Sequence, residues 1–399
     1  MSPHFHIPYA VPTVLLAIAL VSRAPTFLRA WRDPEVRATT LLLLWATAVL
    51  VVITPANIDR LNRLTGVPNI ASPWAYSFLT ASCATGLAMI IRWREAPSPR
   101  RQRTIRRLYG AYAGVVVALW ATFALADAPV PRIYDLDTYY ADTPWMREHI
   151  LLYLLAHLAS CVVSTRLLAK WFPQIAHPWL KAGVVFLQIG FSSGLVYDAA
   201  KLTAVTARWC GTDWDVLSTR AAPPFALAQA ALLAVGFIVP QAGPALTAWV
   251  RDRAEYRRLR PLWRTVKVLA PASAKARIGF WSPLDLRLLQ RRQRIHDALR
   301  LLACHLDHGL YARARRAAAA LHGEEAADGL AGAVAVLAAV AACREGAPAA
   351  PAAPADRPPR TAVDLSDHLD AVSLALRHPR TVDGVRRRAT STESLNVHV

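Results

Sequence analysis

Four polar side chains lie within two long apolar segments of this chain, and their types could bind a polar solute or pass protons. His157 belongs to one segment, and Tyr197, Asp198 and Lys201 belong to the next. Ionisable groups at membrane depth are costly, so they face protein or a water-filled cavity and mark candidate sites. Asp198 and Lys201 are three residues apart, and on a helix such residues lie on one face and can form an ion pair.

His157 and Asp198 are expected at the same depth. His157 is about seven residues after the start of the segment 150–168, and Asp198 is about seven residues before the end of the segment 182–205. At about 1.5 Å per residue, both lie roughly 10 Å below one membrane edge. A contact between them could relay protons. A histidine satisfied by hydrogen bonds, and a structural Asp198–Lys201 ion pair, are the alternatives that the sequence leaves open.

The segment 182–205 also carries a pattern for close helix packing. Gly190 and Gly194 form a G-x-x-x-G motif, which lets a second helix approach its backbone. At 100° per residue, these glycines share one third of the helix surface with the polar residues 197, 198 and 201. Gln229, in the segment 225–239, is read as an interhelical hydrogen-bonding residue.

Seven apolar segments must position these side chains. The chain of 399 residues is 54% hydrophobic, and its mean hydropathy is +0.26. Backbone groups have no water partner in hydrocarbon, so each segment is expected to be a helix. The sequence therefore predicts an all-α polytopic membrane protein, a seven-helix transmembrane bundle with a helical cytoplasmic C-terminal domain. The segments are 7–22, 38–53, 71–91, 108–126, 150–168, 182–205 and 225–239.

The basic residues predict the orientation of the bundle. The connections after the first, third and fifth segments, together with Arg166 at the end of the fifth, hold fourteen Lys or Arg residues, against six Arg residues on the opposite side. Because basic residues concentrate in cytoplasmic connections, the N-terminus is expected outside and the C-terminus inside. We therefore expect a multi-pass protein of the plasma membrane. The outer connection 54–69 could dip back and cap the bundle or form an ordinary loop.

Composition divides the chain into four parts. Residues 1–250 form the expected transmembrane domain, and residues 251–345 a basic, helical cytoplasmic domain. An Ala/Pro-rich linker follows at 346–360. Residues 361–399 are expected to hold a short helix and a disordered tail.

Two features of the cytoplasmic part suggest its partners. Exposed arginines next to the last membrane helix are expected to contact anionic lipid headgroups; they are Arg251, Arg253, Arg257, Arg258 and Arg260. An apolar stripe within 282–310 must pack against the rest of the tail, a second copy or a cytoplasmic protein. Because few aromatic residues follow Trp281, nucleic acid is not an expected partner.

Several classes of enzyme lack their motifs here. The chain has no G-x-S-x-G, no H-E-x-x-H and no P-loop sequence. Its five cysteines are scattered, without the spacing of a paired-cysteine metal site. From the sequence we therefore expect no enzyme, no cofactor and no metal.

Short motifs in two regions carry a family resemblance. Thr54-Pro55 and R-L-T-G-V-P-N at 63–69 lie in the outer connection, and Y-R-R-L-R-P-L-W-R at 256–264 follows the last membrane segment. D-L-R at 285–287 and R-Q-R-I-H-D at 292–297 come next. Over residues 7–310 the chain resembles an actinobacterial family described as transporters, with seven membrane helices and a C-terminal cytoplasmic domain of unknown function. The resemblance transfers no site residue.

The resemblance and the polar stripe of 182–205 together favour transport of an unidentified solute. The predicted site is His157, Tyr197, Asp198 and Lys201. The alternative is a membrane receptor or scaffold whose cytoplasmic helical domain recruits protein partners.

Overall fold

The computed structural model describes residues 10–269, 282–347, 365 and 367–396, and every regular element within them is a helix. This confirms the predicted all-α class. The chain divides into two compact units, Met1–Pro244 and Ala245–Val399, which we call the membrane unit and the C-terminal unit. The division falls within one long helix.

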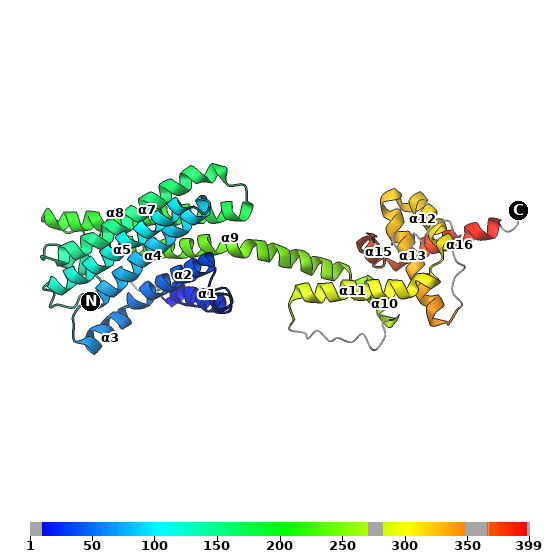
Figure 1. Ribbon diagram of the computed structural model, residues 1–399, viewed down its shortest axis with the longest axis horizontal. Helices are drawn as coiled ribbons and strands as arrows, with labels where there is room; N and C mark the ends of the chain where they lie inside the picture. The colour runs from blue at the N-terminus through cyan, green and yellow to red at the C-terminus, as the bar shows by residue number, and fades with distance from the viewer. Residues whose placement is uncertain (1–9, 270–281, 348–364, 366, 397–399) are drawn as a thin grey trace. The chain divides into compact units, whose positions relative to one another are not determined.

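The helices of the membrane unit follow the seven predicted segments, and Figure 1 shows them running side by side. They are α1 (Ala10–Arg29), α2 (Pro34–Val52), α4 (Ala71–Arg94), α5 (Pro99–Leu125), α7 (Met146–Trp171), α8 (Pro178–Trp209) and α9 (Ala222–Arg258). Such long helices satisfy their backbone groups internally, as lipid requires.

Among the described residues, six helices are long and apolar enough to cross a membrane, and a bent pair makes seven. Five of the six are α4, α5, α7, α8 and α9, and the bent pair is α2 with α3 (Pro55–Thr65), at an angle of 78°. The sixth is α13 (Glu324–Arg344), in the C-terminal unit. The chain is therefore a multi-pass integral membrane protein.

Large apolar side chains cover the outside of the membrane unit. Val117 is 69% exposed, and Leu155 and Ile189 are each 52% exposed. Contiguous apolar surface of this kind is unusual on a soluble monomer and is the surface that lipid requires.

The connection 54–69 is mostly a short helix that is bent by 78° from α2. Most of it is α3, which has no buried residue and ends where Gly66 adopts a left-handed backbone with φ of 68°. Glycine adopts this conformation without a steric penalty. The sharp bend between α2 and α3 fits either a broken span or a re-entrant segment, so both alternatives for this connection stay open.

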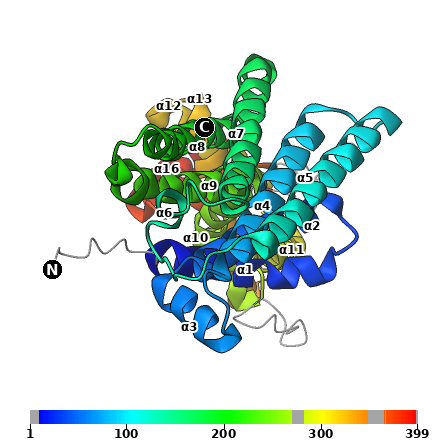
Figure 2. The same cartoon turned by 90° about the vertical axis from the view of Figure 1, so that its left-hand side faces the viewer.

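The connection between α5 and α7 covers one end of the bundle, and we call residues 126–145 the Asp137 loop. It contains the short helix α6 (Leu136–Tyr139), which Figure 2 shows beside α8. Asn69 holds this loop: its amide donates to the carbonyls of Ala128 and Val130 at 3.2 and 2.9 Å, and its oxygen accepts from the Arg132 N–H at 2.7 Å. The loop is thereby fixed with Asp137 buried.

The C-terminal unit is a helical domain with its own core. Besides the end of α9, its longer helices are α10 (Arg260–Val266), α11 (Leu284–Leu302), α12 (His308–His322), α13, α15 (Leu369–Ala375) and α16 (Pro379–Asn396). Leu330, Val334 and Val336 place α13 at the centre of this core. The apolar composition of α13 is thus explained by burial within the unit.

The apolar stripe of 282–310 is buried inside the same unit. Leu288, Ile295 and Leu302 of α11 belong to the core that contains α13. The stripe that was expected to need a covering surface therefore finds one within its own domain.

The end of the chain differs from the disordered tail that the sequence predicts. α16 packs into the C-terminal core through Val382, Val385 and Ala389. These residues recur at intervals of three and four, a helical stripe that the surrounding arginines obscure. Of the predicted linker and short helix, residues 348–364 and 366 lie outside the described residues.

Candidate functional site

Asp137 is the centre of a buried polar cluster that the sequence does not reveal. The Lys201 ammonium donates to its carboxylate at 2.6 Å, and the hydroxyls of Tyr76 and Tyr153 each donate to it at 2.8 Å. Lys201 therefore pairs with Asp137, and the predicted Asp198–Lys201 ion pair is wrong. The reason is the Asp137 loop, which brings its own carboxylate next to Lys201.

The Asp137 carboxylate is ionised in this cluster. Burial would raise its pKa, but the charge and hydrogen bond of Lys201, together with the two tyrosine hydroxyls, hold the pKa below its ordinary value. A salt bridge thus lies almost wholly buried, with the Lys201 side chain 11% exposed and the Asp137 side chain 5% exposed.

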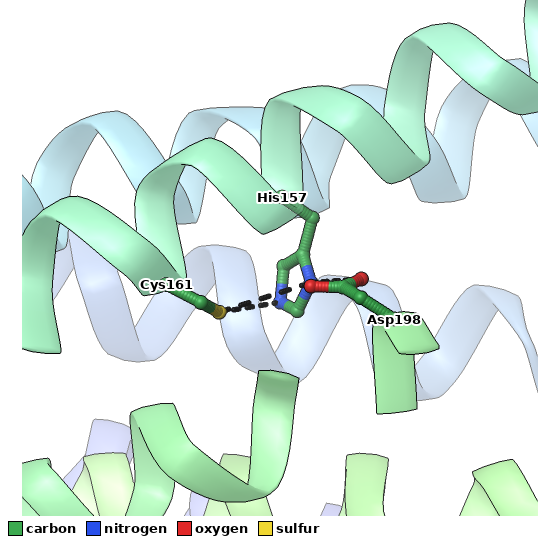
Figure 3. A group of neighbouring side chains, drawn as sticks. All are labelled: His157, Cys161 and Asp198. Atoms are coloured by element: carbon green, nitrogen blue, oxygen red, sulfur yellow. Dashed lines mark hydrogen bonds and ion pairs between the residues drawn. The ribbon is translucent and has the colours of Figure 1, made fainter. Parts of the chain in front are cut away.

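His157 and Asp198 form a second buried pair. The Nδ1 atom of His157 lies 2.8 and 3.0 Å from the two carboxylate oxygens of Asp198, and both side chains are buried. The contact that the matching depths suggested is therefore present. Figure 3 shows the imidazole between Asp198 on one side and Cys161 on the other.

Gln229 and Cys161 contact the opposite edge of the same imidazole. The Gln229 amide nitrogen lies 3.0 Å from Nε2 of His157, and the Cys161 sulfur lies 3.8 Å from it. Gln229 thus makes the interhelical hydrogen bond that its position in 225–239 predicted.

Tyr197 lies between the two pairs. Its ring meets the His157 ring edge-on, with centroids 5.8 Å apart, and the Lys201 Nζ atom lies 6.0 Å from the Tyr197 ring centroid. The structure therefore brings together all four predicted site residues. It adds Asp137 from the connection between α5 and α7.

A cavity of ≈ 290 Å³ adjoins both pairs inside the membrane unit. One wall is polar and includes Tyr76, Asp137, Tyr153, His157 and Lys201. The residues from α2 and most of those from α9 are apolar, with Leu42, Leu50, Leu227, Leu233 and Phe237, and Gln229 is the polar exception on α9. Pockets with mostly apolar walls and a few convergent polar groups are typical binding sites.

Two serine side chains of this cavity, Ser160 and Ser218, have an unused hydrogen-bonding capacity. The Oγ atom of Ser218 is buried, lines the cavity and has no hydrogen-bond partner among the described residues. Ser218 belongs to a π-helical turn, Leu217–Ala221, that precedes α9. Such turns are frequent at functional sites, and the free hydroxyl can accept or donate to a bound solute.

The two glycines of the G-x-x-x-G motif face α9. A Cβ atom on Gly190 would lie 3.1 Å from Leu233, and one on Gly194 would lie 2.5 Å from the Gln229 amide and 2.7 Å from the Cys161 sulfur. The missing side chain of Gly194 is therefore what allows Gln229 to reach His157.

A second buried histidine, His149, has a structural role. Its Nδ1 atom lies 3.0 Å from the Leu119 carbonyl oxygen, and its Nε2 atom lies 3.4 Å from the Ser72 hydroxyl. Both nitrogens are therefore used in joining α7 to α5 and α4, and His149 is not among the cavity-lining residues.

The five arginines predicted to face lipid headgroups are all exposed. The neighbouring Tyr256 packs under the guanidinium of Arg291, 3.4 Å from its ring centroid, with Arg287 at 5.2 Å. The motif residues near 256 and 290 are thus spatial neighbours within the C-terminal unit.

Comparison with known protein families matches residues 248–378 to a family of unknown function (DUF6545). The match covers the end of α9 through α15 and includes no residue that lines the cavity. It agrees with the expected C-terminal domain of unknown function. No curated protein and no solved structure matches the chain.

Proposed function

We propose that this protein is a membrane transporter whose solute binds in the cavity beside the Asp137–Lys201 and His157–Asp198 pairs. The observation that carries the proposal is the position of two buried pairs of ionisable side chains, Asp137–Lys201 and His157–Asp198, next to one cavity. Ionisable groups inside a membrane unit are costly and typically mark solute or proton pathways. A bundle that needed only stability would be served as well by apolar contacts.

The walls of the cavity indicate the class of solute. The α2 wall and most of the α9 wall offer apolar contact, whereas Gln229 of α9 and the wall with Asp137 offer an amide, a carboxylate, an ammonium and tyrosine hydroxyls. A solute that satisfies both has an apolar body and a hydrogen-bonding head. The free hydroxyl of Ser218 gives the head one more partner.

The test uses proteoliposomes that contain the full chain and an internal pH-sensitive dye. Medium-chain fatty acids and hydrophobic amines serve as probes, and uptake is measured together with proton movement. We expect Asp198→Asn to abolish uptake or its proton coupling without changing protein levels in the membrane. Ser192→Ala is the matched control, because this α8 side chain is exposed and does not line the cavity. Unchanged uptake together with unchanged proton movement in Asp198→Asn would remove the proposal.

The topology is part of this proposal. The connections after α1, α4 and α7 carry most of the basic residues, so we place them and the C-terminal unit in the cytoplasm and the Asp137 loop outside the plasma membrane. The five exposed arginines near Arg257 then meet anionic headgroups. A phosphatase fused behind residue 399 should be inactive, and activity on the exterior would reverse the assignment.

A receptor or scaffold is the second candidate. It is favoured by the C-terminal unit, which has its own core and coincides with most of the family match. Truncation after Leu259 distinguishes the two functions. Normal solute flux with loss of a co-purifying cytoplasmic protein would support the receptor, and lost flux with no change in associated proteins would support the transporter.

A further inference from the structure

We infer that the cavity binds an amphiphile with an anionic head, a carboxylate or a phosphate, and that this head lies against Arg132 and Ser218. The inference rests on the proposed function, because it names the class of solute for the same cavity. It decides between an acidic and a basic head group, which the proposed function leaves open.

The unused hydrogen-bonding groups of the cavity can all donate. Among the described residues, three side chains that line the cavity have a buried polar atom without a hydrogen-bond partner: Arg132 at Nε, and Ser160 and Ser218 at Oγ. A guanidinium nitrogen only donates, and a serine hydroxyl can donate as well as accept. A carboxylate or phosphate head can therefore accept from each of them, whereas an ammonium head can use only the two hydroxyls.

The acceptor that a basic head would need is already occupied. Among the described residues that line the cavity, Asp137 is the only acidic one. Its carboxylate accepts from the Lys201 ammonium and from the hydroxyls of Tyr76 and Tyr153. An ammonium head would have to displace one of these contacts, whereas an anionic head leaves all three in place.

Arg132 is held in position for such a contact. Its guanidinium carbon lies 3.5 Å from the centroid of the Tyr139 ring, and its Nη1 atom donates to the Asp135 carboxylate at 3.3 Å. Neither Tyr139 nor Asp135 lines the cavity. An arginine binds carboxylate or phosphate oxygens through pairs of parallel N–H groups, and the buried Nε–H is available for one such bond. Because the side chain is already fixed, little of its freedom is lost on binding.

Ser218 lies at the same end of the bundle as Arg132. α8 ends at Trp209, whose indole N–H donates to the Ala141 carbonyl of the Asp137 loop at 2.9 Å. The chain then continues to the π-helical turn that contains Ser218 and precedes α9. We therefore expect the head group at this end, next to the Asp137 loop.

The apolar body has room along the helices, away from the loop. Leu42 of α2, Gly86 of α4 and Phe237 of α9 line the far end of the cavity, where a Cβ on Gly86 would lie 3.7 Å from Phe237 and 3.9 Å from Leu42. Ile53 lines the cavity at the end of α2 that leads toward the loop. A helix rises about 1.5 Å per residue, so the stretch of α2 from Leu42 to Ile53 is about 17 Å long. An alkyl chain parallel to the helices fits this shape.

The test is binding of radiolabelled dodecanoate to the full chain in phosphatidylcholine nanodiscs, with empty nanodiscs measured in parallel. Dodecylammonium is the paired competitor, because it has the same tail and the opposite charge. We expect saturable binding of dodecanoate that dodecylammonium does not displace. Displacement by dodecyl phosphate would show a site that takes both anions, and its absence a site for carboxylates; either result supports the anionic head.

Two variants locate the head group. Arg132→Gln removes a charged donor and should weaken dodecanoate binding about 10–100-fold, and Ser218→Ala removes a neutral one and should weaken it about 2–10-fold. Arg147→Gln is the matched control, because this arginine is exposed at the start of α7 and does not line the cavity. It should bind dodecanoate as the wild type does.

Displacement of dodecanoate by dodecylammonium in the wild type would overturn the inference, even if Arg132→Gln fails to fold. Equal losses of binding in Arg147→Gln and Arg132→Gln would also overturn it, since any arginine would then serve. Transport in proteoliposomes separates the two conclusions. A chain that binds dodecanoate through Arg132 but moves none contradicts only the proposed function. Transport of dodecylammonium without dodecanoate would overturn the inference and leave the proposed function standing.

Discussion

α5 of the membrane unit and α13 of the C-terminal unit are both long and apolar, but they meet different surroundings. In an apolar stretch of 18 residues within α5, only 6% of the residues are buried, against 61% in the corresponding stretch of α13. α13 is covered by its own domain, whereas α5 needs lipid to cover it. Composition alone therefore does not separate a membrane helix from a core helix.

The two units also differ in their buried polar side chains, which are more numerous in the membrane unit. The membrane unit buries Asp137, His149, His157, Asp198 and Lys201. Among the described residues of the C-terminal unit, the only buried polar side chain is Ser373, whose hydroxyl bonds the backbone of Arg258 and Leu262. The unit with an apolar exterior holds the ionisable residues inside, and this is where a site is expected.

The largest loss of stability is expected when the Asp137–Lys201 ion pair is broken. Lys201→Met leaves the Asp137 carboxylate buried without its counter-charge, which costs about 3–5 kcal/mol. Asp137→Asn combined with Lys201→Met should recover most of this loss. Unfolding in mixed micelles, followed by circular dichroism, measures both. Equal losses in the single and double variants would show that the ionic contact is not what stabilises the loop.

A core change should affect only the C-terminal unit. Leu302 is fully buried there, and Leu302→Ala removes its packing at a cost of about 2–5 kcal/mol. Limited proteolysis should then cleave the C-terminal unit at lower temperature and leave the membrane unit protected. The exposed Leu289→Ala is the control. Simultaneous loss of protection in both units would mean that they unfold together.

The next largest change in stability is expected where α8 packs closely against α9. Gly194→Ala places a methyl group against Gln229 and Cys161, at a cost of about 1–3 kcal/mol. Gly110→Ala on α5 meets nothing within 4 Å and should stabilise its helix by up to about 1 kcal/mol. Unfolding midpoints of the two variants should move in opposite directions.

The smallest effect concerns a surface ion pair of the C-terminal unit. Arg315 contacts Asp328 at 2.7 Å, and both side chains are partly exposed to solvent. Asp328→Asn should leave the unfolding midpoint within the scatter of repeated measurements, because solvent screens such pairs. A loss as large as that of Lys201→Met would erase the contrast between the units.

The membrane helices and the depth of His157 and Asp198 could be predicted because lipid imposes length and composition on each segment. The buried position of Asp137 could not be predicted, because its loop has no periodic pattern and a carboxylate is common in any surface loop. The partner of Lys201 was therefore misassigned.

Asp198 and Lys201 are one turn apart on α8, yet each is held by a different neighbour: His157 on α7, and Asp137 on the loop. A rotation of α8 about its axis would strain both attachments at once. One turn of α8 therefore joins the imidazole of α7 to the loop that closes the end of the bundle.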